Sequence, residues 1–306
     1  MFRTKPGEER ALIEDWINRP ALRKLVEAFG GTWPEGDLET VVAALAEFSD
    51  LWDYRAGKHD RHFFHDKKET SDPYQDLTYW TAKELGMIEP PPPSRSSYDY
   101  LLILGGLATG VEPRIRYAMH LVAEGLGVER QIAALGSFRH LQDRELPVST
   151  RYAPEGRYEV DHLAAMLAEL FGVEESWSIR PRGQPEVDPA LASLSAIKMR
   201  EVGPDLGIYA AASSDPEGRP ANTADTFHFL AEVNDLEAGQ EVLIVTSGIY
   251  LPYQHLDAVR TLSPYRLGIE TVGVVGDQPG PTHSAAAYRQ EIRSTLRSAR
   301  ASLPSQ

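Results

Sequence analysis

The sequence predicts an α/β fold in which a mainly parallel sheet follows an all-α N-terminal extension. Up to residue 89 the apolar residues recur at helical spacing. After residue 97, short apolar runs alternate with amphipathic stretches, which is typical of βαβ units whose sheet is covered by helices on both faces. Four consecutive prolines, Pro90 to Pro93, separate the two parts, because proline neither continues a helix nor donates to a sheet. We therefore expect a helical domain over 1–89, a linker over 90–97 and an α/β domain over 98–301.

Each part divides into elements by its apolar pattern. In the N-terminal part the spacing predicts helices around Ala11 to Ile17, Leu22 to Phe29 and Val41 to Phe48. Beyond the linker we expect strands at Tyr98 to Leu104, Gln131 to Leu135, Leu206 to Ala212, Val242 to Thr246 and Thr271 to Val275. The helices expected there are Arg114 to Gly125, Val160 to Phe171, Thr223 to Asn234, Tyr253 to Leu262 and Ser284 to Ala301. The segment 180–203 has no assigned place, apart from a short helix expected at Ala190 to Met199.

Composition limits the classes of protein and of chemistry. With 42% hydrophobic and 25% charged residues, the 306-residue chain has the composition of a globular protein. Its net charge of −14 disfavours a nucleic-acid partner, and the absence of cysteine excludes disulfides, thiolate nucleophiles and zinc–thiolate sites. The N-terminus carries no apolar leader, and no segment has the roughly 18 apolar residues of a membrane helix. We expect a cytoplasmic protein without a membrane partner.

The residues that follow each predicted strand are candidates for a ligand site, because ligands of open α/β sheets bind beyond the carboxyl ends of the strands. Gly105 and Gly106 follow the first strand, and Arg114 lies near the start of the next helix. Glycine amides, a helix N-terminus and a guanidinium all favour an anion. The alternative is that the glycines serve only a tight turn between strand and helix.

Polar residues follow the other strands as well. Glu159 begins a predicted helix, where an acid is also an ordinary partner of the helix dipole. Asn222 and Thr223 stand where such residues cap helices more often than they catalyse. Ser137 follows the second strand. The fourth strand is followed by two hydroxyls, a glycine and two phenols, which suit the binding of a polar small molecule: Thr246, Ser247, Gly248, Tyr250 and Tyr253, with His255 shortly after them.

These motifs occur in an order that resembles a known family. The runs are Tyr98 to Gly106 with Arg114 or Arg116, Gly136-Ser137, Glu159 to Leu167, Asn222 to Thr226, and Val242 to Ser247. Together they resemble the SanA/YdcF/ElyC-like domain-of-unknown-function family over residues 98–275. The resemblance implies a Rossmann-like, doubly wound domain with its pocket at the strand ends. It also implies that this pocket is lined by Gly105, Gly106, Arg114, Glu159, Asn222, Thr223, Thr246 and Ser247.

The chain departs from that family in two places. Relatives usually carry a histidine shortly after the Thr-Ser pair and an arginine a few residues later, whereas this chain has Tyr250 and Gln254 near those positions and His255 one step further on. The reaction of the relatives is then either lost or carried by Tyr250, Tyr253 and His255 in another way. The helical extension also lies outside the family pattern.

That extension contains one polar cluster, Trp52 to Asp66, with histidines at 59, 62 and 65. Pairs of these histidines have a spacing that metal sites use, but a polar, aromatic-rich surface between domains explains the cluster equally well, and we assign no metal. Tyr54 and Arg55 could instead reach over the strand-end pocket as a lid.

The function expected from these observations is that of a cytoplasmic α/β enzyme. It would bind a nucleotide-like or phosphorylated small molecule for group transfer or hydrolysis, with S-adenosylmethionine as one option for a cofactor. Glu159, Tyr250 and His255 are the candidate catalytic residues. Gly105, Gly106, Arg114, Ser137, Asn222, Thr223, Thr246 and Ser247 are the candidate binding residues. The alternative is a non-catalytic binding or regulatory protein, and the sequence leaves a homodimer open.

Overall fold

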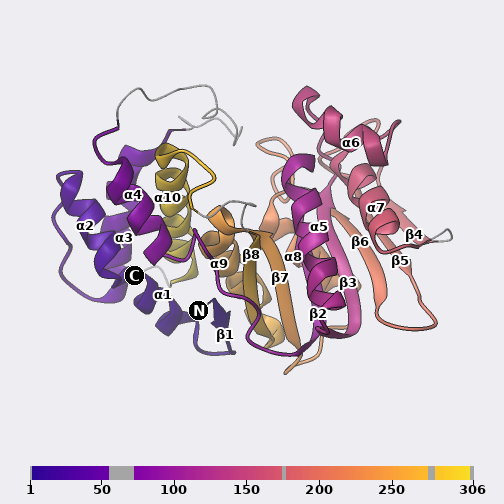
Figure 1. Cartoon of the computed structure of the whole chain (residues 1–306), viewed down its shortest axis with the longest axis horizontal. Coiled ribbons are helices and arrows are strands. Elements are labelled where there is room, and N and C mark those ends of the chain that lie inside the picture. Colours follow the sequence, from indigo (N-terminus) through magenta and orange to yellow (C-terminus); the bar gives the residue numbers. More distant parts are fainter. Residues whose placement is uncertain (1, 55–71, 174–176, 275–279, 304–306) are drawn as a thin grey trace.

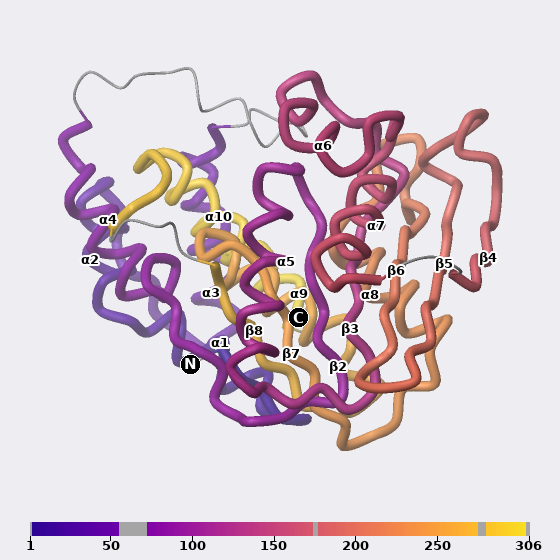
Figure 2. Tube along the Cα trace, turned by 45° about the vertical axis from the view of Figure 1, so that its right-hand side comes forward, coloured from indigo at the N-terminus to yellow at the C-terminus, as the bar shows by residue number. Residues whose placement is uncertain are grey.

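The computed structural model describes residues 2–54, 72–173, 177–274 and 280–303. They form a mixed α/β structure with one eight-stranded, mostly parallel sheet and helices packed on both of its faces (Figures 1 and 2).

The N-terminal part is helical, as the apolar spacing predicts, but its first residues add a strand. Its elements are β1 (Arg3–Thr4), α1 (Glu9–Ile17), α2 (Pro20–Ala28), α3 (Leu38–Phe48), the 3-10 helix η1 (Ser49–Trp52) and α4 (Gln75–Glu84). Local chemistry sets several helix starts: Pro20 is the first residue of α2, and the Asp37 side chain caps α3 by accepting from the Thr40 amide. The two residues of β1 pair antiparallel with the last strand, and they are too few for periodicity to reveal.

The part beyond the prolines alternates strands and helices. Its elements are β2 (Ser97–Leu104), α5 (Ala108–Ala123), β3 (Gly127–Ser137), η2 (Asp143–Glu145), α6 (Leu146–Tyr152), α7 (Glu159–Leu170), β4 (Ser178–Arg182), β5 (Ser193–Lys198), β6 (Asp205–Ala211), α8 (Thr223–Val233), β7 (Glu241–Ser247), η3 (Gly248–Tyr250), α9 (Leu251–Leu262), η4 (Ser263–Tyr265), β8 (Gly268–Val274) and α10 (Ala285–Ser302). With one exception, each expected strand and helix corresponds to one of these. The bounds agree within four residues except at α5, which begins at Ala108, six residues before the expected Arg114.

The exception is the short helix expected at Ala190 to Met199, which is wrong. Residues 193–198 form β5, which pairs antiparallel with β6 and with β4. Serines such as Ser193 and Ser195 have only a weak local preference, and the helix preference of a single alanine, Ala196, is small. The ladder offered by the open edge of β6 therefore decides their conformation.

The strand order is β1-β8-β7-β2-β3-β6-β5-β4. The five central strands, β8, β7, β2, β3 and β6, run parallel, and the outer strands are antiparallel to their neighbours. The chain moves outward from β2 through β3 to β6, and then returns to β7 on the other side of β2. The order of the strands therefore reverses between β2 and β7.

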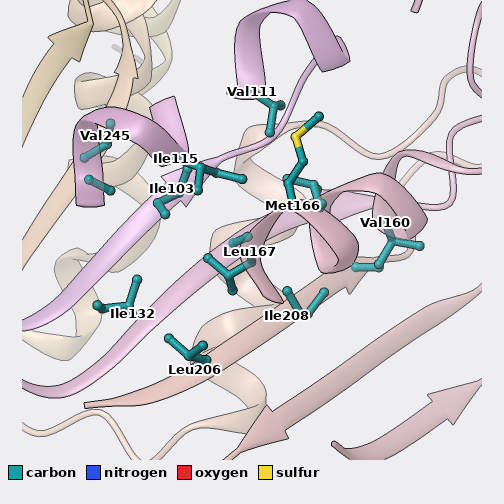
Figure 3. Packing of buried hydrophobic residues seen from close by; sticks show 14 of the residues in the cluster. Ile103, Val111, Ile115, Ile132, Val160, Met166, Leu167, Leu206, Ile208 and Val245 are labelled. Atoms are coloured by element: carbon teal, nitrogen blue, oxygen red, sulfur yellow. The ribbon is translucent and has the colours of Figure 1, made fainter. Parts of the chain in front are cut away.

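Each face of the sheet has its own apolar core. On one face, α5 and α7 pack on β2 and β3 through a cluster that includes Ile103, Ile115, Met166 and Leu167 (Figure 3). On the other face, α8 and α9 enclose a second cluster around Leu102, Ile244 and Phe227. Successive strand residues belong to different clusters because their side chains alternate between faces.

A third cluster joins the two parts of the chain. It brings Trp16, Leu25 and Leu45 of the N-terminal helices together with Leu256 of α9 and Ile292 of α10. The segment with the prolines is also attached to the sheet. The amide and the hydroxyl of Ser94 each donate a hydrogen bond of 2.7 Å to the buried carboxylate of Glu270 in β8. None of the helices that the structure describes combines the length and apolar character needed to cross a bilayer.

Candidate functional site

A cleft of about 830 Å³ opens at the carboxyl ends of the parallel strands. One wall consists of the turns that follow β2, β3 and β7, which include Gly105, Ser137 and Ser247. The facing wall comes from the N-terminal part, at Asp53 and Met87 to Glu89, and from α10, at Gln290, Arg293, Ser294 and Arg297. The cleft thus spans the point between β2 and β7 where the strand order reverses.

Most of the residues expected from the sequence line this cleft. Those that line it are Gly105, Gly106, Arg114, Ser137, Glu159, Asn222, Thr223, Ser247 and Tyr250. Thr246, Tyr253 and His255 are buried and do not belong to the lining. Arg116 also stays outside the cleft, on the exposed side of α5, where it pairs with Glu112 at 2.9 Å.

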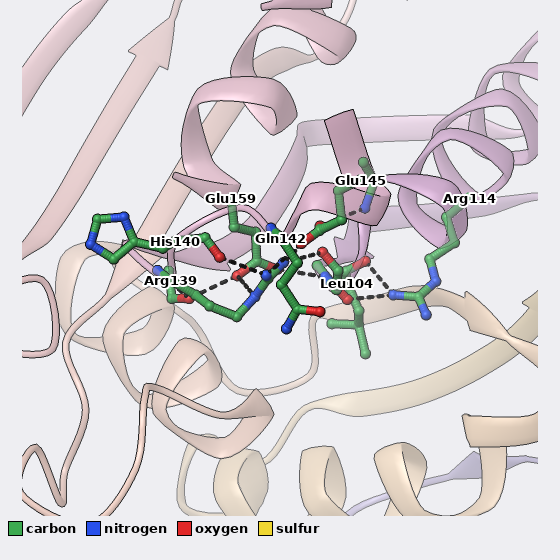
Figure 4. A network of polar contacts seen from close by, with 11 residues as sticks. Leu104, Arg114, Arg139, His140, Gln142, Glu145 and Glu159 are labelled. Atoms are coloured by element: carbon green, nitrogen blue, oxygen red, sulfur yellow. Dashed lines mark hydrogen bonds and ion pairs between the residues drawn. The ribbon is translucent and has the colours of Figure 1, made fainter. Parts of the chain in front are cut away.

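Glu159 lies at the start of α7 and is only 5% exposed. Its Oε1 atom accepts the amide of Gly106, and its Oε2 atom accepts the hydroxyl of Ser137 at 2.7 Å. The guanidinium of Arg139 lies 3.8 Å from the same Oε2 atom (Figure 4). The carboxylate therefore holds the turn after β2 against the end of β3, and a catalytic role would require one of these contacts to open.

The glycine turn after β2 is required by this close packing. A Cβ atom on Gly105 would stand 2.4 Å from Oε1 of Glu159 and 2.5 Å from the carbonyl oxygen of Leu135. Gly106 has a φ of 148°, a backbone conformation that L side chains rarely adopt. The turn brings the Gly106 amide to a carboxylate of the protein itself, as an anion-binding turn would bring it to a ligand.

A second carboxylate, which we did not predict, caps the next helix. Glu145 is fully buried, and its Oε1 atom accepts the amide of Ala108, the first residue of α5, at 3.0 Å. Arg139 holds both oxygens of Glu145, at 2.7 and 3.0 Å (Figure 4). Burial alone would raise the pKa of Glu145, but the hydrogen bonds and charge of Arg139 and the amides of Gln142 and Ala108 lower it below its usual value. The sequence offers little signal for Glu145, because it lies in the short 3-10 helix η2, ten residues beyond the end of the strand predicted at Gln131 to Leu135.

Arg114 reaches back from α5 to the ends of two strands and is only 3% exposed. Its guanidinium donates to the carbonyl oxygens of Leu104, at 2.7 Å, and Gly105, and to the Ser247 hydroxyl at 3.0 and 3.1 Å. These bonds join the end of β2 to the end of β7 across the reversal point. The guanidinium also lies 5.9 Å from the centre of the Tyr250 ring.

Thr246 belongs to a buried chain of polar contacts behind the cleft. Its hydroxyl donates to the Gln254 side chain, whose amide nitrogen lies 3.3 Å from the Thr223 hydroxyl. Asn222 caps α8: its side chain accepts the Asp225 amide, and Asp225 in turn accepts the Asn222 amide. Gln254 thus connects β7, α9 and α8.

His255 is part of the core and not of the cleft. Its ring lies 2.9 Å from the hydroxyls of both Thr4 and Thr271, and it packs edge-on against Phe2. Burial lowers its pKa from 6.5 to about 3. We therefore leave His255 out of the site. Of the aromatic candidates from the sequence, Tyr250 lines the cleft.

The cleft is also lined by three arginines that the sequence analysis did not single out: Arg219, Arg293 and Arg297. Arg219 pairs with the buried Asp225, while Arg293 and Arg297 on α10 pair with acids of the N-terminal part. With Arg114 and Arg139, the described lining holds five arginines against the three acids Asp53, Glu89 and Glu159. The described lining thus has more arginines than acids although the whole chain is acidic, and Glu145, Asp225 and Asp50 pair with four of these arginines from outside the lining.

The polar cluster predicted within 52–66 lies mostly outside the described residues, including His59, His62, His65 and Arg55. Tyr54 is described: its hydroxyl accepts Nε of Arg289 at 2.8 Å, and Tyr54 is not among the residues that line the cleft. Within the part of the chain that the structure describes, no three His, Asp or Glu side chains gather as metal ligands would.

Comparison with known proteins places the chain in a family. A family model described as the Rv3785 N-terminal domain matches residues 2–86. The uncharacterized protein Rv3785 of Mycobacterium tuberculosis (strain H37Rv) and the uncharacterized protein Mb3814 of Mycobacterium bovis are each 31% identical to this chain over 325 residues. The alignment covers 96% of this chain and 89% of either relative. No solved structure matches at a significant level. Because the likeness extends over nearly the whole length of both chains, this protein belongs to the family of the uncharacterized mycobacterial protein Rv3785.

Proposed function

We propose that the cleft binds an anionic small molecule, nucleotide-like or phosphorylated, and that the protein acts on it by group transfer or hydrolysis. The observation that carries the proposal is the cleft itself, whose 830 Å³ is the size of a small-molecule pocket and whose lining has more cations than anions. An acidic protein that gathers five arginines around one cleft is better suited to a small anion than to a polyanion.

We propose further that the part beyond the prolines is a doubly wound, Rossmann-like domain of the SanA/YdcF/ElyC-like kind. Two facts support this. The parallel strands have the order β8-β7-β2-β3-β6, and α5 and α7 cover one face while α8 and α9 cover the other. In such folds the ligand binds beyond the carboxyl strand ends, at the reversal of strand order, which is where the cleft lies. S-adenosylmethionine is therefore among the ligands to test.

A second candidate function is binding without catalysis. It is favoured because two of the three expected catalytic residues make their hydrogen bonds within the protein itself. Both oxygens of Glu159 accept hydrogen bonds within the scaffold, and His255 lies in the core. Tyr250 is then the candidate catalytic residue that still faces the cleft. A protein that senses or carries its ligand would need nothing more than the cleft.

Binding is tested by ligand-induced stabilisation. The thermal unfolding of the full chain is measured with S-adenosylmethionine, S-adenosylhomocysteine, ATP, UDP-sugars and sugar phosphates. A ligand at 100 times its dissociation constant adds about 2.7 kcal/mol to the free energy of unfolding, which is readily measured as a rise in Tm. Analysis of the bound ligand by mass spectrometry then separates the two candidates, because an enzyme converts its ligand and a binding protein returns it unchanged.

A cleft-filling substitution shows whether the ligand occupies this cleft. Thr109 is exposed at the start of α5 and lines the cleft, so Thr109→Trp should abolish the rise in Tm. Thr150→Trp, on the exposed side of α6 and outside the lining, is the matched control and should leave the rise intact. A panel without any hit, or a hit that Thr109→Trp leaves unchanged, would contradict the proposal.

A further inference from the structure

The arginines that line the cleft fall into two sets with different hydrogen bonding. At the strand ends, Arg139 holds both oxygens of Glu145 and the carbonyl oxygens of Gly106 and His140. Arg219 holds both oxygens of Asp225 and the Ser214 hydroxyl. Arg114 is bound to two backbone carbonyls and to Ser247. These guanidiniums already donate their hydrogen bonds to acceptors within the protein.

The backbone donors of the strand-end turn are committed in the same way. The Gly106 amide donates to Glu159, and the Ala108 amide at the start of α5 donates to Glu145. A helix N-terminus and a glycine turn usually attract an anion because their amides lack acceptors. Here internal carboxylates supply those acceptors and also bring negative charge, so an incoming phosphate would have to displace a buried acid.

The second set lies on the opposite wall, on α10. Arg293 and Arg297 are four residues apart and therefore project from one face of the helix. Arg293 is 8% exposed, and its Nε atom is buried without a hydrogen-bond partner among the described residues. Its terminal nitrogen lies 2.9 Å from Asp53 and 3.2 Å from Asp50. The side chain of Arg297 is 53% exposed, and its one recorded ion pair among the described residues is with Asp50, at 2.7 Å.

We infer that the anionic group of the ligand, a phosphate or diphosphate, binds on α10 at Arg293 and Arg297 and not at the glycine turn. This rests on the proposed function of the cleft and specifies which wall receives the charge. A buried guanidinium N–H without an acceptor is costly, and a ligand oxygen at Nε of Arg293 would remove that cost. Two adjacent guanidiniums also suit the several oxygens of a phosphate better than one does.

Asp50 regulates this subsite by competition. One of its oxygens lies within hydrogen-bond distance of both Arg293 and Arg297, and its side chain is 56% exposed. It therefore occupies guanidinium donors that a phosphate would use, and it repels the phosphate. Removing the charge of Asp50 should strengthen phosphate binding, which no loss of a merely structural contact would do.

The test uses inorganic pyrophosphate as the probe and isothermal titration of the full chain at low salt. Arg297→Gln should weaken binding by about tenfold or more, as expected when one charge-assisted contact is lost. Arg293→Lys keeps the charge but removes the Nε donor and should also weaken it. Asp50→Asn should tighten binding severalfold. Arg300→Gln is the matched control, since Arg300 lies on the same helix, is 54% exposed and stays outside the cleft lining.

Thermal unfolding of every variant accompanies the titrations, so that a failure to fold is not read as a failure to bind. If Arg219→Gln weakens pyrophosphate binding while the α10 variants leave it unchanged, the anion binds at the strand ends; the inference is then wrong and the proposed function stands. If pyrophosphate does not bind the unmodified chain although the ligand panel yields a hit, the inference alone also falls. A panel without any hit removes the proposed function together with the inference.

Discussion

Single side chains decide how the cleft can work. Glu145 and Glu159 fill the donor-rich turn between β2 and α5, which by sequence looks like an anion site. Each carboxylate accepts a backbone amide, and each is joined to Arg139. Since these acids are buried and paired, removing either partner would leave a buried charge uncompensated. The residues that looked catalytic in the sequence are thus scaffold residues in the fold, apart from Tyr250.

A residue of the neighbouring core makes stability depend on pH. His162 of α7 is fully buried, and both of its ring nitrogens lack hydrogen-bond partners among the described residues. Burial lowers its pKa from 6.5 to about 4. Between pH 6.5 and pH 4, His162 is protonated in the unfolded chain but not in the folded chain, so the free energy of unfolding decreases as pH falls. The loss reaches about 3 kcal/mol by pH 4.

His162→Leu should remove that loss, because leucine cannot be protonated. At pH 7 we expect the variant to be at least as stable as the parent, since no described hydrogen bond is broken. The measurement is urea unfolding from pH 7.5 to pH 4. The exposed His120 provides the control, and His120→Leu should keep the pH dependence of the parent. An unchanged pH dependence in His162→Leu would show that other groups control acid unfolding.

At the level of helices and strands, helix caps and strand pairing determine where the residues of the cleft lie. The capping box of Asn222 and Asp225 fixes the start of α8 beside the strand ends. The strand β5 forms where local spacing favoured a helix, because the ladder with β6 outweighs a weak local preference. The 3-10 helix η3 turns the chain from β7 into α9 and presents Tyr250 to the cleft.

Asn222 allows the capping role and a ligand role to be separated. Asn222→Ala removes the cap and should lower the free energy of unfolding by about 1 kcal/mol. Asn222→Ser keeps a side-chain oxygen for the Asp225 amide and adds no charge beside Asp225 or the cleft, but it loses the amide donor. If Asn222 is only a cap, Asn222→Ser should match the parent in both stability and ligand binding, as measured by urea unfolding and titration with a hit from the panel. Weaker binding at unchanged stability would instead assign Asn222 to the ligand.

At the scale of the whole molecule, the N-terminal part and the α/β part share a core. Trp16, Leu25 and Leu45 pack with Leu256 of α9 and Ile292 of α10, and β1 extends the sheet at β8. The cleft also depends on both parts, since Asp53 and Met87 to Glu89 form one side of it. Dividing the chain at the prolines would therefore expose apolar surface on both pieces and open the cleft.

We expect that residues 90–306 alone do not unfold cooperatively and that they aggregate, because the outer faces of α9 and α10 lose their cover. Calorimetry and size-exclusion chromatography measure both properties. Co-expression with residues 1–89 is the control and should restore a soluble complex with a single unfolding transition. A piece 90–306 that melts cooperatively near the Tm of the full chain would contradict this expectation.

Much of the fold was predictable from periodicity, because each central strand is a short apolar run and each covering helix is amphipathic. The placement of the site at the strand ends was predictable for a related reason, since Gly105, Ser137 and Ser247 immediately follow or end strands of a parallel sheet. β1 and β5 were not predictable, because pairing with distant strands creates them. The position of Glu145 was not predictable either, because it is the fold that brings the 3-10 helix η2 to the start of α5.

The pattern of apolar and polar residues is enough to predict the α/β class, the helical N-terminal part and the edge of the sheet at which polar residues collect. What those residues do depends on contacts that exist only in the folded chain. Hydrogen-bond partners depend on contacts between segments far apart in the chain, such as Arg114 with Ser247 or Arg293 with Asp50. Through such contacts the glycine turn donates to an acid of the protein itself, and His255 lies in the core between Thr4 and Thr271. Contacts of the same kind bring Arg293 and Arg297 of the last helix to the cleft, where Nε of Arg293 has no acceptor among the described residues.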